Sequence, residues 1–541
     1  MCSLQDQRTS RSWLLAVIVA VLTPPAIRAQ DPKVIIVGER PMADAVKTLG
    51  CKLGVGQGAG NAAKINAYLA SRPGYDLYLP GGALEIDDTL VTAEETGGFN
   101  IYGNGPTADL NDNNYNGGIK AGQPSRLVWA GPEGEPMIQW NSRMGSIRGV
   151  CFQGRPIPTT PTATKARIGI HVRTAQQTSG NIPVGKLRLE DCAFLDVCNP
   201  ILFGYDLDTA LGGDPDVGTY NNSDESMWHN CLFYFPFNAG AGDGQMSATA
   251  NVVTLNAADH GIVRGSWVDV EWSGGKRLGM ICDLVSGADI TLRGGSGDAL
   301  PSEATSVYAS EERSCFHFRT HQAVAFTGGK VTVYGHPHDI FWFERGGKLF
   351  QQHLSVAGWN LAKASGVRCD VLRLGDVRIG YFDIGFDLDA TCSNVRLLQM
   401  DSTIAEGRCH VQFHGCISDI TSAAGYAYAV PLINAQGTCE VMLRDIGFIQ
   451  PGSIDLTGYD GIPLIRKRVA SCHLENCSLL ANCTVGKDVL GTVTGPHWLT
   501  MRDCTVQNSG SLDASGFQGT PIEDGETIDG GILLGDKIPY Q

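Results

Sequence analysis

The sequence predicts an all-β protein built as a solenoid of stacked coils, and three observations lead to this prediction. The chain of 541 residues contains 68 glycines, spread along its whole length rather than gathered in tracts. This is well above the usual share of about 7% and is typical of many short strands separated by turns. An N-terminal helix is followed by strand-like segments with glycine-rich corners. A short motif also recurs at a spacing close to one coil.

The N-terminal residues 1–29 have the organisation of a secretory signal peptide. Arg8 and Arg11 precede an apolar run at residues 13–22, and residues 27–29 offer a cleavage site. The apolar run is too short to span a bilayer. We therefore expect an exported protein, secreted or periplasmic, with no membrane insertion after cleavage.

The charge balance bears on the partners of the protein. The formal net charge is −15. Removing residues 1–29, with three Arg and one Asp, leaves 38 basic and 55 acidic residues and a net charge of −17. We expect no nucleic-acid partner, because binding to phosphates needs clustered Lys and Arg. An acidic polymer would need a local basic patch or a bridging cation.

Sixteen cysteines remain after the signal peptide, and an exported protein can use them in disulfides. The alternative is that cysteine serves as a small buried hydrophobic residue. We expect a mixture of both, with local pairs in Cys192/Cys198 and in the group Cys472, Cys477 and Cys483.

The first part of the solenoid spans residues 30–245. Residues 61–71 form an amphipathic helix that precedes the turn at residues 72–74 and is expected to cap the solenoid. Short strands follow at residues 76–79, 83–86 and 99–102, separated by Pro-Gly-Gly and Gly-Asn-Gly corners.

The recurring motif has an apolar residue, a polar pair ending in Asp or Asn, a small residue, and another apolar residue. The marker positions Cys416, Ile446, Cys477 and Cys504 lie 30, 31 and 27 residues apart. Each coil buries its apolar residues only by stacking on its neighbours. The acidic or amide residue suits a tight bend in the left-handed region, so we assign it to structure rather than catalysis. These bend residues are Asp191, Asn230, Asp445, Asn476 and Asp503.

Residues 246–310 interrupt the repeat with four strands of period two, which predict a small inserted antiparallel barrel or sandwich. It could form a wall beside a groove of the solenoid or be a passive decoration. The second part of the solenoid then spans residues 311–520, and residues 521–541 form a C-terminal tail.

The cap helix, the LeuTyrLeuProGlyGly step at residues 77–82, the AsnIleTyrGlyAsnGly step at residues 100–105 and the LeuGluAspCysAlaPhe coils resemble the right-handed parallel β-helix of the pectate-lyase-like superfamily. The resemblance covers residues 55–245 and 311–520. It implies that the protein is a polysaccharide lyase, a polysaccharide hydrolase or a surface protein that holds glycans. The motif set of the polygalacturonases does not occur in order, which lowers the weight of that family.

A lyase must neutralise a uronate carboxylate, remove the adjacent proton and protonate the leaving oxygen, which Lys, Arg, His and Tyr can do. The densest supply of these residues follows the insertion, where alternation places His317, Arg319 and His321 on one side of a strand. We therefore expect the catalytic residues to be His317, Arg319, Lys330, Tyr334 and His336. We expect substrate contacts from His321, His338, Arg373, Arg378 and Tyr381.

A hydrolase would instead need two carboxyl groups at the scissile bond. The candidates are Asp206, Asp208, Asp224, Glu225, Asp383, Asp387 and Asp389. Asp206 and Asp208 also lie in an oxygen-rich loop that could hold Ca²⁺, with a solvated loop as the alternative. We expect no required cofactor and treat Ca²⁺ as optional.

The function expected from the sequence is that of an exported carbohydrate-active enzyme that cleaves an extended polysaccharide in a groove of the solenoid. The supply of basic residues favours β-elimination slightly over hydrolysis. The alternatives are a non-catalytic glycan-binding or tailspike-like surface protein, and a solenoid with a structural role only. The expected partner is a polysaccharide, and the expected assembly is a monomer or a homotrimer.

Overall fold

The computed structural model divides into two units, Met1–Met42 and Ala43–Gln541, and the fold belongs to the second. The expected signal peptide lies outside the described residues. These are residues 42–54, 56–71, 76–93, 98–105, 124–142, 144–155, 165–172, 186–204, 225–235, 240–247, 251–258, 260–319, 325–335, 337–344, 347–359, 369–375, 377, 379–390, 395–400, 404–419, 433–434, 437–448, 471–479, 498–502, 505–506, 527–528 and 531–533.

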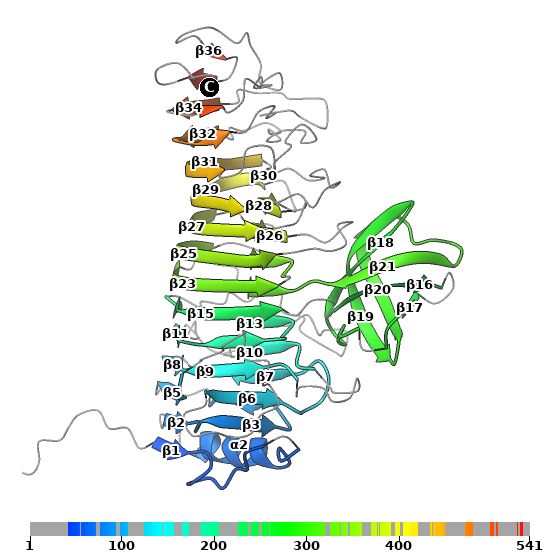
Figure 1. The fold of residues 1–541 in the computed structure, drawn as a ribbon, viewed down its shortest axis with the longest axis vertical. Helices are drawn as coiled ribbons and strands as arrows, with labels where there is room; N and C mark the ends of the chain where they lie inside the picture. Colours follow the sequence, from blue (N-terminus) through cyan, green and yellow to red (C-terminus); the bar gives the residue numbers. More distant parts are fainter. Residues whose placement is uncertain are drawn as a thin grey trace, which may run out of the picture. The chain divides into compact units, whose positions relative to one another are not determined.

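The second unit is a right-handed parallel β-helix, as the sequence predicts (Figure 1). A typical coil contributes two strands to a long sheet, sheet A, and one strand to a second sheet, sheet B. In one such coil these are β11 (Lys186–Glu190), β12 (Ala193–Leu195) and β13 (Asn199–Phe203). Each pairs in parallel with the equivalent strands of the coils before and after it.

The first described strand, β1 (Met42–Asp44), belongs to sheet A, and the short strands β33 (Ser478–Leu479) and β35 (Thr505–Val506) pair with each other. The remaining strands of sheet A are β2 (Asp76–Tyr78), β3 (Gly82–Ile86), β5 (Phe99–Tyr102), β6 (Ser125–Trp129), β8 (Met144–Arg148), β9 (Val150–Gln153), β14 (Met227–His229), β15 (Cys231–Phe235), β23 (Ala325–Gly335), β25 (Gly347–Trp359), β27 (Ile379–Ala390), β29 (Ile404–Asp419), β31 (Gly437–Phe448), β32 (Ser471–Glu475), β34 (Trp498–Arg502), β36 (Thr527–Ile528) and β37 (Gly531–Leu533).

Sheet B follows the other side of the same coils. Its remaining strands are β4 (Leu90–Val91), β7 (Pro136–Trp140), β10 (Ile168–Val172), β22 (Ser314–Phe318), β24 (Asp339–Phe343), β26 (Cys369–Leu374), β28 (Val395–Met400) and β30 (Ile433–Asn434).

The core of the solenoid is built from columns of stacked side chains. On sheet A, Phe194 stacks on Phe152 and Phe233 of the neighbouring coils, with ring centroids 4.9 and 5.1 Å apart. On sheet B, Phe318 stacks on Phe203 and Phe343 at 5.0 and 4.0 Å. Burying each such ring stabilises the fold by about 1.5–3 kcal/mol. Because the coils are in register, a position that points inward in one coil points inward in the next.

The bend residues have the conformation that the sequence predicts. Asp191, Asn230, Asp445 and Asn476 have φ values of 50°, 51°, 55° and 51°. Asn230 Nδ2 also donates to Asp191 Oδ1, and Asn476 Nδ2 donates to Asp445 Oδ1, each over 2.7 Å. The structural role of these four residues is confirmed, whereas Asp503 lies outside the described residues.

The predicted disulfide between Cys192 and Cys198 is wrong, because both cysteines are free and buried. Cys192 lies beneath the bend, where its Sγ donates to the carbonyl of Ile147 over 3.3 Å. The Cys477 Sγ makes the same contact with the carbonyl of Leu443 over 3.4 Å. Burial raises the pKa of the Cys192 thiol to about 12, so it acts as a small hydrophobic residue. The Cys472 side chain and Cys483 lie outside the described residues.

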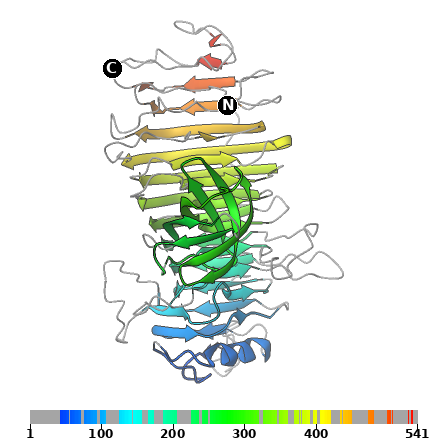
Figure 2. The ribbon, with the colours of Figure 1, turned by 90° about the vertical axis from the view of Figure 1, so that its right-hand side faces the viewer.

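The predicted cap helix is α2 (Asn61–Ser71), at the first coils (Figure 2). Its buried Ile65 and Leu69 belong to the main core. The Asp87 carboxylate accepts hydrogen bonds from the backbone N–H groups of Gly60 and Ala62, over 2.7 and 3.2 Å, at the positive end of the helix dipole. The helix thereby covers core side chains that no further coil buries. No helix among the described residues is long and apolar enough to cross a membrane.

The predicted insertion is a closed antiparallel barrel with its own hydrophobic core. Its strands, in order around the barrel, are β16 (Ala241–Met246), β17 (Val252–Leu255), β20 (Asp289–Gly297), β19 (Gly275–Ser286), β18 (Trp267–Trp272) and β21 (Thr305–Glu311). The four predicted strands are β17 to β20. The sequence did not reveal β16, whose AlaGlyAspGlyGlnMet has no apolar alternation.

We predict that the bend conformation contributes measurably to stability. Replacing Asn230 with Ala should lower the free energy of unfolding by about 1–2 kcal/mol, because an alanine is strained at this φ and the hydrogen bond to Asp191 is lost. Asn230→Gly should lower the free energy of unfolding by a smaller amount, since glycine tolerates the conformation. Urea titration followed by circular dichroism measures both variants. Equal losses in the two would mean that backbone strain is not the cause.

Candidate functional site

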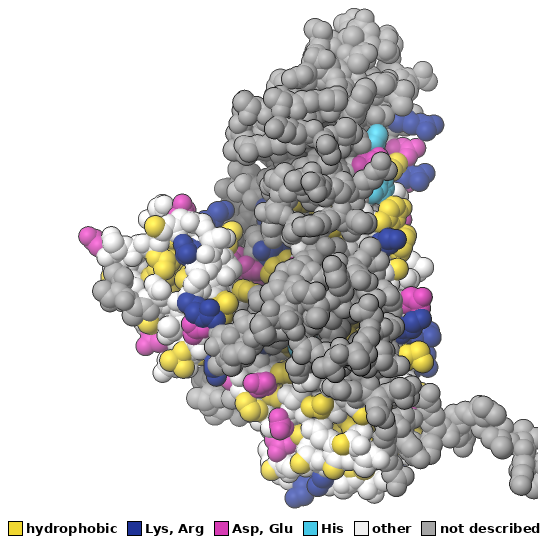
Figure 3. Space-filling view, turned by 180° about the vertical axis from the view of Figure 1, so that it is seen from behind, with side chains coloured by type: hydrophobic (Ala, Val, Ile, Leu, Met, Phe, Trp, Pro, Cys, Tyr) yellow, Lys and Arg dark blue, Asp and Glu magenta, His cyan; other side chains and the backbone are white. Residues whose placement is uncertain are grey.

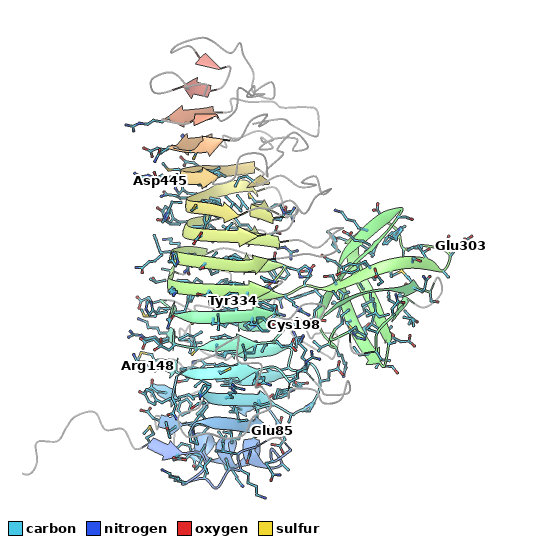
Figure 4. All side chains as sticks on the ribbon, in the orientation of Figure 1. Glu85, Arg148, Cys198, Glu303, Tyr334 and Asp445 are labelled. Atoms are coloured by element: carbon cyan, nitrogen blue, oxygen red, sulfur yellow. The ribbon has the colours of Figure 1, made fainter. Side chains whose placement is uncertain are left out.

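The residues expected to form one catalytic cluster lie on two different sheets. His317 is on β22 of sheet B, and Arg319 follows that strand. Lys330 and Tyr334 are on β23 of sheet A, and Tyr334 is labelled in Figure 4. The two pairs therefore do not form a single described site. His321, His336, Arg378, Asp206, Asp208 and Asp224 lie outside the described residues.

His317 lies between the solenoid and the barrel. Its neighbours Phe316 and Phe318 point into the core, so its own side chain points out of the coil, as alternation predicts. Its ring stacks on Trp342 of β24 at a centroid distance of 4.0 Å and an interplanar angle of 4°. Trp267 of the barrel strand β18 meets both rings edge-on, at 5.2 and 5.1 Å. The barrel thus covers this position, and His317 is fully buried.

Glu344, which follows β24, is the ionic partner of this group. His317 Nε2 lies 2.7 Å and Arg319 Nε lies 3.0 Å from its Oε1 atom. Burial lowers the pKa of His317, against the opposing hydrogen bond to Glu344. Burial alone would raise the pKa of Glu344, but Arg319 and His317 outweigh it and lower that pKa to about 2. Glu344 is therefore ionised and already neutralises Arg319.

Further buried charges hold the barrel on the solenoid. Arg373 lies over the ring of Trp342, with its Cζ 3.9 Å from the ring centroid, and its Nη1 is 2.8 Å from Glu312 Oε2. His338 Nε2 is 2.8 Å from Ser310 Oγ of β21. We call His317, Arg319, Glu344, Arg373, His338, Trp267 and Trp342 the barrel junction. Arg319 is paired with Glu344 and Arg373 with Glu312, so these charges are already neutralised, and the contacts of Trp267 and Ser310 join the barrel to the solenoid.

A different set of chemically active side chains lies on the outer face of sheet A. Lys348 of β25 is in register with Tyr381 of β27, Tyr381 with His410 of β29, and His410 with Glu440 of β31. The flanking Leu349, Phe382, Val411 and Val441 are buried, so the four side chains point outward. We call this set the outer column.

Three members of the outer column, Tyr381, His410 and Glu440, contact one another in turn. Tyr381 stacks on His410 with ring centroids 5.1 Å apart and an interplanar angle of 15°. His410 Nδ1 lies 3.3 Å from Glu440 Oε2, and the nearby His473 Nε2 of β32 lies 3.3 Å from Glu440 Oε1. Phe350, a large hydrophobic residue that is 41% exposed, packs against Tyr381 with ring centroids 5.3 Å apart. The column combines a cation, a phenol, an imidazole and a carboxylate on the outer surface of the coils.

A second histidine and carboxylate lie beside this column. His414 Nε2 is 3.2 Å from Asp383 Oδ1, and both side chains are about one third exposed, at 39% and 30%. Histidine, acidic and basic side chains gather along one edge of the described surface (Figure 3). Within the described residues, no group of three or more His, Cys, Asp or Glu side chains could hold a metal ion.

Of the residues that the sequence singled out, Lys330, Tyr334, Tyr381 and the alternative carboxylates Asp383 and Asp387 are on the outer face of sheet A. Lys330 and Tyr334 are in register with His353 and Ala357 of β25, outside the outer column. Lys348, His410, Glu440 and His473 were missed, because each is isolated in the sequence. Their spacing was the available signal: Lys348, Tyr381, His410, Glu440 and His473 follow one another at 33, 29, 30 and 33 residues. That spacing matches the coil repeat, which brings such positions side by side.

Comparison with known proteins gives no family. No family model matches the sequence, and no curated protein matches it. Among solved structures, the catalytic unit of a thermostable GH87 alpha-1,3-glucanase from Streptomyces thermodiastaticus strain HF3-3 is 11% identical, with a TM-score of 0.28, over 92% of this chain and 68% of that one. The tailspike protein gp49 from Pseudomonas phage LKA1 is 13% identical, with a TM-score of 0.16, over 86% and 55%. At these values the similarities assign no activity to the chain.

We predict that the barrel junction weakens in acid. A lowered pKa of His317 means that its contribution is present above its ordinary pKa of 6.5 and decreases as the pH falls below it. The contribution of Glu344 is present above its ordinary pKa of 4.5 and is lost as the pH falls toward 2. Scanning calorimetry should show the midpoint of thermal unfolding falling across this range.

Glu344→Gln should lower the unfolding temperature at pH 7, because it leaves Arg319 buried beside a neutral group. It should also make the midpoint of thermal unfolding less dependent on pH below 4.5. Glu303→Gln, at an exposed position of the barrel labelled in Figure 4, is the control and should change neither. A Glu344→Gln protein with the wild-type acid dependence would contradict this account of the junction.

Proposed function

We propose that the protein binds an extended, uronate-containing polysaccharide on the outer face of sheet A and cleaves it by β-elimination at the outer column. The observation that carries this proposal is the register of Lys348, Tyr381 and His410 on three consecutive coils. Adjacent strands lie about 4.8 Å apart, so the backbone positions of these residues span about 10 Å. The flexible Lys348 side chain has the length to place its ammonium beside the sugar that His410 contacts.

Each step of an elimination has a residue in this column. The Lys348 ammonium neutralises the uronate carboxylate, which acidifies the adjacent C5 proton. His410 removes that proton, a double bond forms between C4 and C5, and the bond from C4 to the glycosidic oxygen breaks. Tyr381 donates its phenolic proton to the leaving oxygen. The protonated His410 then releases a proton to solvent and the tyrosinate takes one from solvent, which restores the starting state.

Elimination is favoured over hydrolysis by the types of residue on this face. Hydrolysis requires two carboxyl groups on opposite sides of one bond. Asp383 and Glu440 each lie beside a histidine and are two coils apart, whereas Asp387 is four residues further along the strand of Asp383 and Glu475 is held by arginines. The barrel junction is a weaker candidate for elimination, because Arg319 is paired with Glu344 and His317 is buried.

The overall negative charge of the chain opposes the binding of an acidic polymer. At a net charge of −15, an acidic polymer is repelled on average. Lys348 and an optional bridging Ca²⁺ would offset that repulsion locally. An exported location and the resemblance to the pectate-lyase-like superfamily agree with a polymeric substrate outside the cytoplasm.

The test is incubation of the purified protein with a panel of uronate-containing and neutral polysaccharides, with and without Ca²⁺. Ultraviolet absorbance reports the unsaturated product of elimination, and a second assay reports new reducing ends. We expect absorbance to rise on at least one uronate polymer. His410→Ala and Tyr381→Phe should each lower the rate by roughly 100-fold or more, as for removal of a general base or acid.

His353→Ala is the matched control, because His353 is an exposed histidine of β25 that lies outside the outer column. It should keep the wild-type rate. New reducing ends without absorbance would replace elimination by hydrolysis at Asp383 and Glu440. Binding without any cleavage would leave a non-catalytic glycan-binding surface.

A further inference from the structure

This inference rests on the proposed function and concerns the residue that controls its general base. We infer that Glu440 is a positioning residue, which fixes the ring of His410 and selects the nitrogen that accepts the substrate proton.

The geometry around Glu440 is that of one carboxylate shared by two imidazoles. Its Oε2 lies 3.3 Å from His410 Nδ1, and its Oε1 lies 3.3 Å from His473 Nε2. The three residues come from three consecutive strands, β29, β31 and β32. Because each oxygen has its own imidazole, rotation of the carboxylate away from His410 would also break its contact with His473.

This arrangement determines which His410 nitrogen is basic. A neutral imidazole carries one N–H, and a neighbouring carboxylate selects the tautomer with the proton on the nitrogen that faces it. For His410 that nitrogen is Nδ1, which leaves Nε2 as the acceptor. The stacking of Tyr381 on the same ring restrains its plane. Glu440 also stabilises the imidazolium that forms when His410 takes the proton, as a carboxylate does behind a catalytic histidine.

Glu440 is the carboxylate that contacts His410, whereas Asp383 and Glu475 contact other residues. Tyr381 and Asp383 lie on the preceding strand β27, where Asp383 contacts His414. On the other side, Glu475 of β32 lies 3.5 Å from Arg444 and 3.6 Å from Arg502. Glu475 is thus a carboxylate of the same face that is held by arginines rather than histidines, which makes it a matched control.

The experiment compares Glu440→Gln with Glu475→Gln by two independent readouts. In protein with ¹⁵N-labelled histidine, nuclear magnetic resonance reports the tautomer of His410, assigned by loss of its signal in His410→Ala. We expect the Nδ1–H tautomer in the wild type, a mixture with Nε2–H in Glu440→Gln, and the wild-type pattern in Glu475→Gln. In the lyase assay, Glu440→Gln should lower kcat roughly 10- to 100-fold with KM near the wild-type value, as for loss of an orienting group.

The two readouts separate this inference from the proposed function. An inactive wild type with the expected tautomer change would reject the proposed elimination while keeping Glu440 as the residue that sets the His410 tautomer. An active enzyme in which Glu440→Gln leaves both the tautomer and kcat unchanged would overturn the inference. A KM effect alone would also overturn it, because it would make Glu440 a substrate contact.

Discussion

The whole structure depends on the in-register stacking of parallel coils. A coil cannot bury its own apolar side chains, so Phe194 needs Phe152 on one side and Phe233 on the other. The same register that aligns inward side chains also aligns the outward ones. Lys348, Tyr381 and His410 are brought together by the physical requirement that builds the core. On this fold, a surface of aligned outward side chains is a consequence of the repeat.

The inserted barrel follows a different principle, because polar and aromatic groups join it to the solenoid. His317, Trp342 and Trp267 are stacked or in edge contact, and Glu344 holds both His317 and Arg319. Buried ion pairs of this kind contribute little net stability but make the loss of one partner costly. They therefore specify where the barrel sits. Residues that look catalytic in the sequence can have this purpose, since a buried pair needs the same Arg, His and Glu.

Local features were predictable from the sequence. The positive φ of Asn230 depends on the residue itself, and the barrel strands carry a clear period of two. What required the structure was the relation between distant segments. Alternation showed that His317 points out of its strand, but it could not show that Trp267 covers it. The Cys192/Cys198 pairing failed because two nearby cysteines can lie at different corners of a coil.

The outer column was within reach of sequence reasoning, because its members recur at the coil spacing. Applying the repeat to polar residues, and not only to the apolar markers, would have aligned Tyr381 with His410. The exact register still depends on the loop in each coil, whose length varies. A position can therefore be assigned to a face from sequence more readily than to a partner.

The central claim is that the substrate binds on the outer face of sheet A and not at the barrel junction. Hydrogen exchange read by mass spectrometry tests this most directly, with saturating polysaccharide and a protein inactivated by His410→Ala. The account predicts slower exchange in peptides from β25, β27, β29 and β31, and unchanged exchange in β22 and β24. Protection confined to β22, β24 and β18 would contradict it and would return the site to the barrel junction.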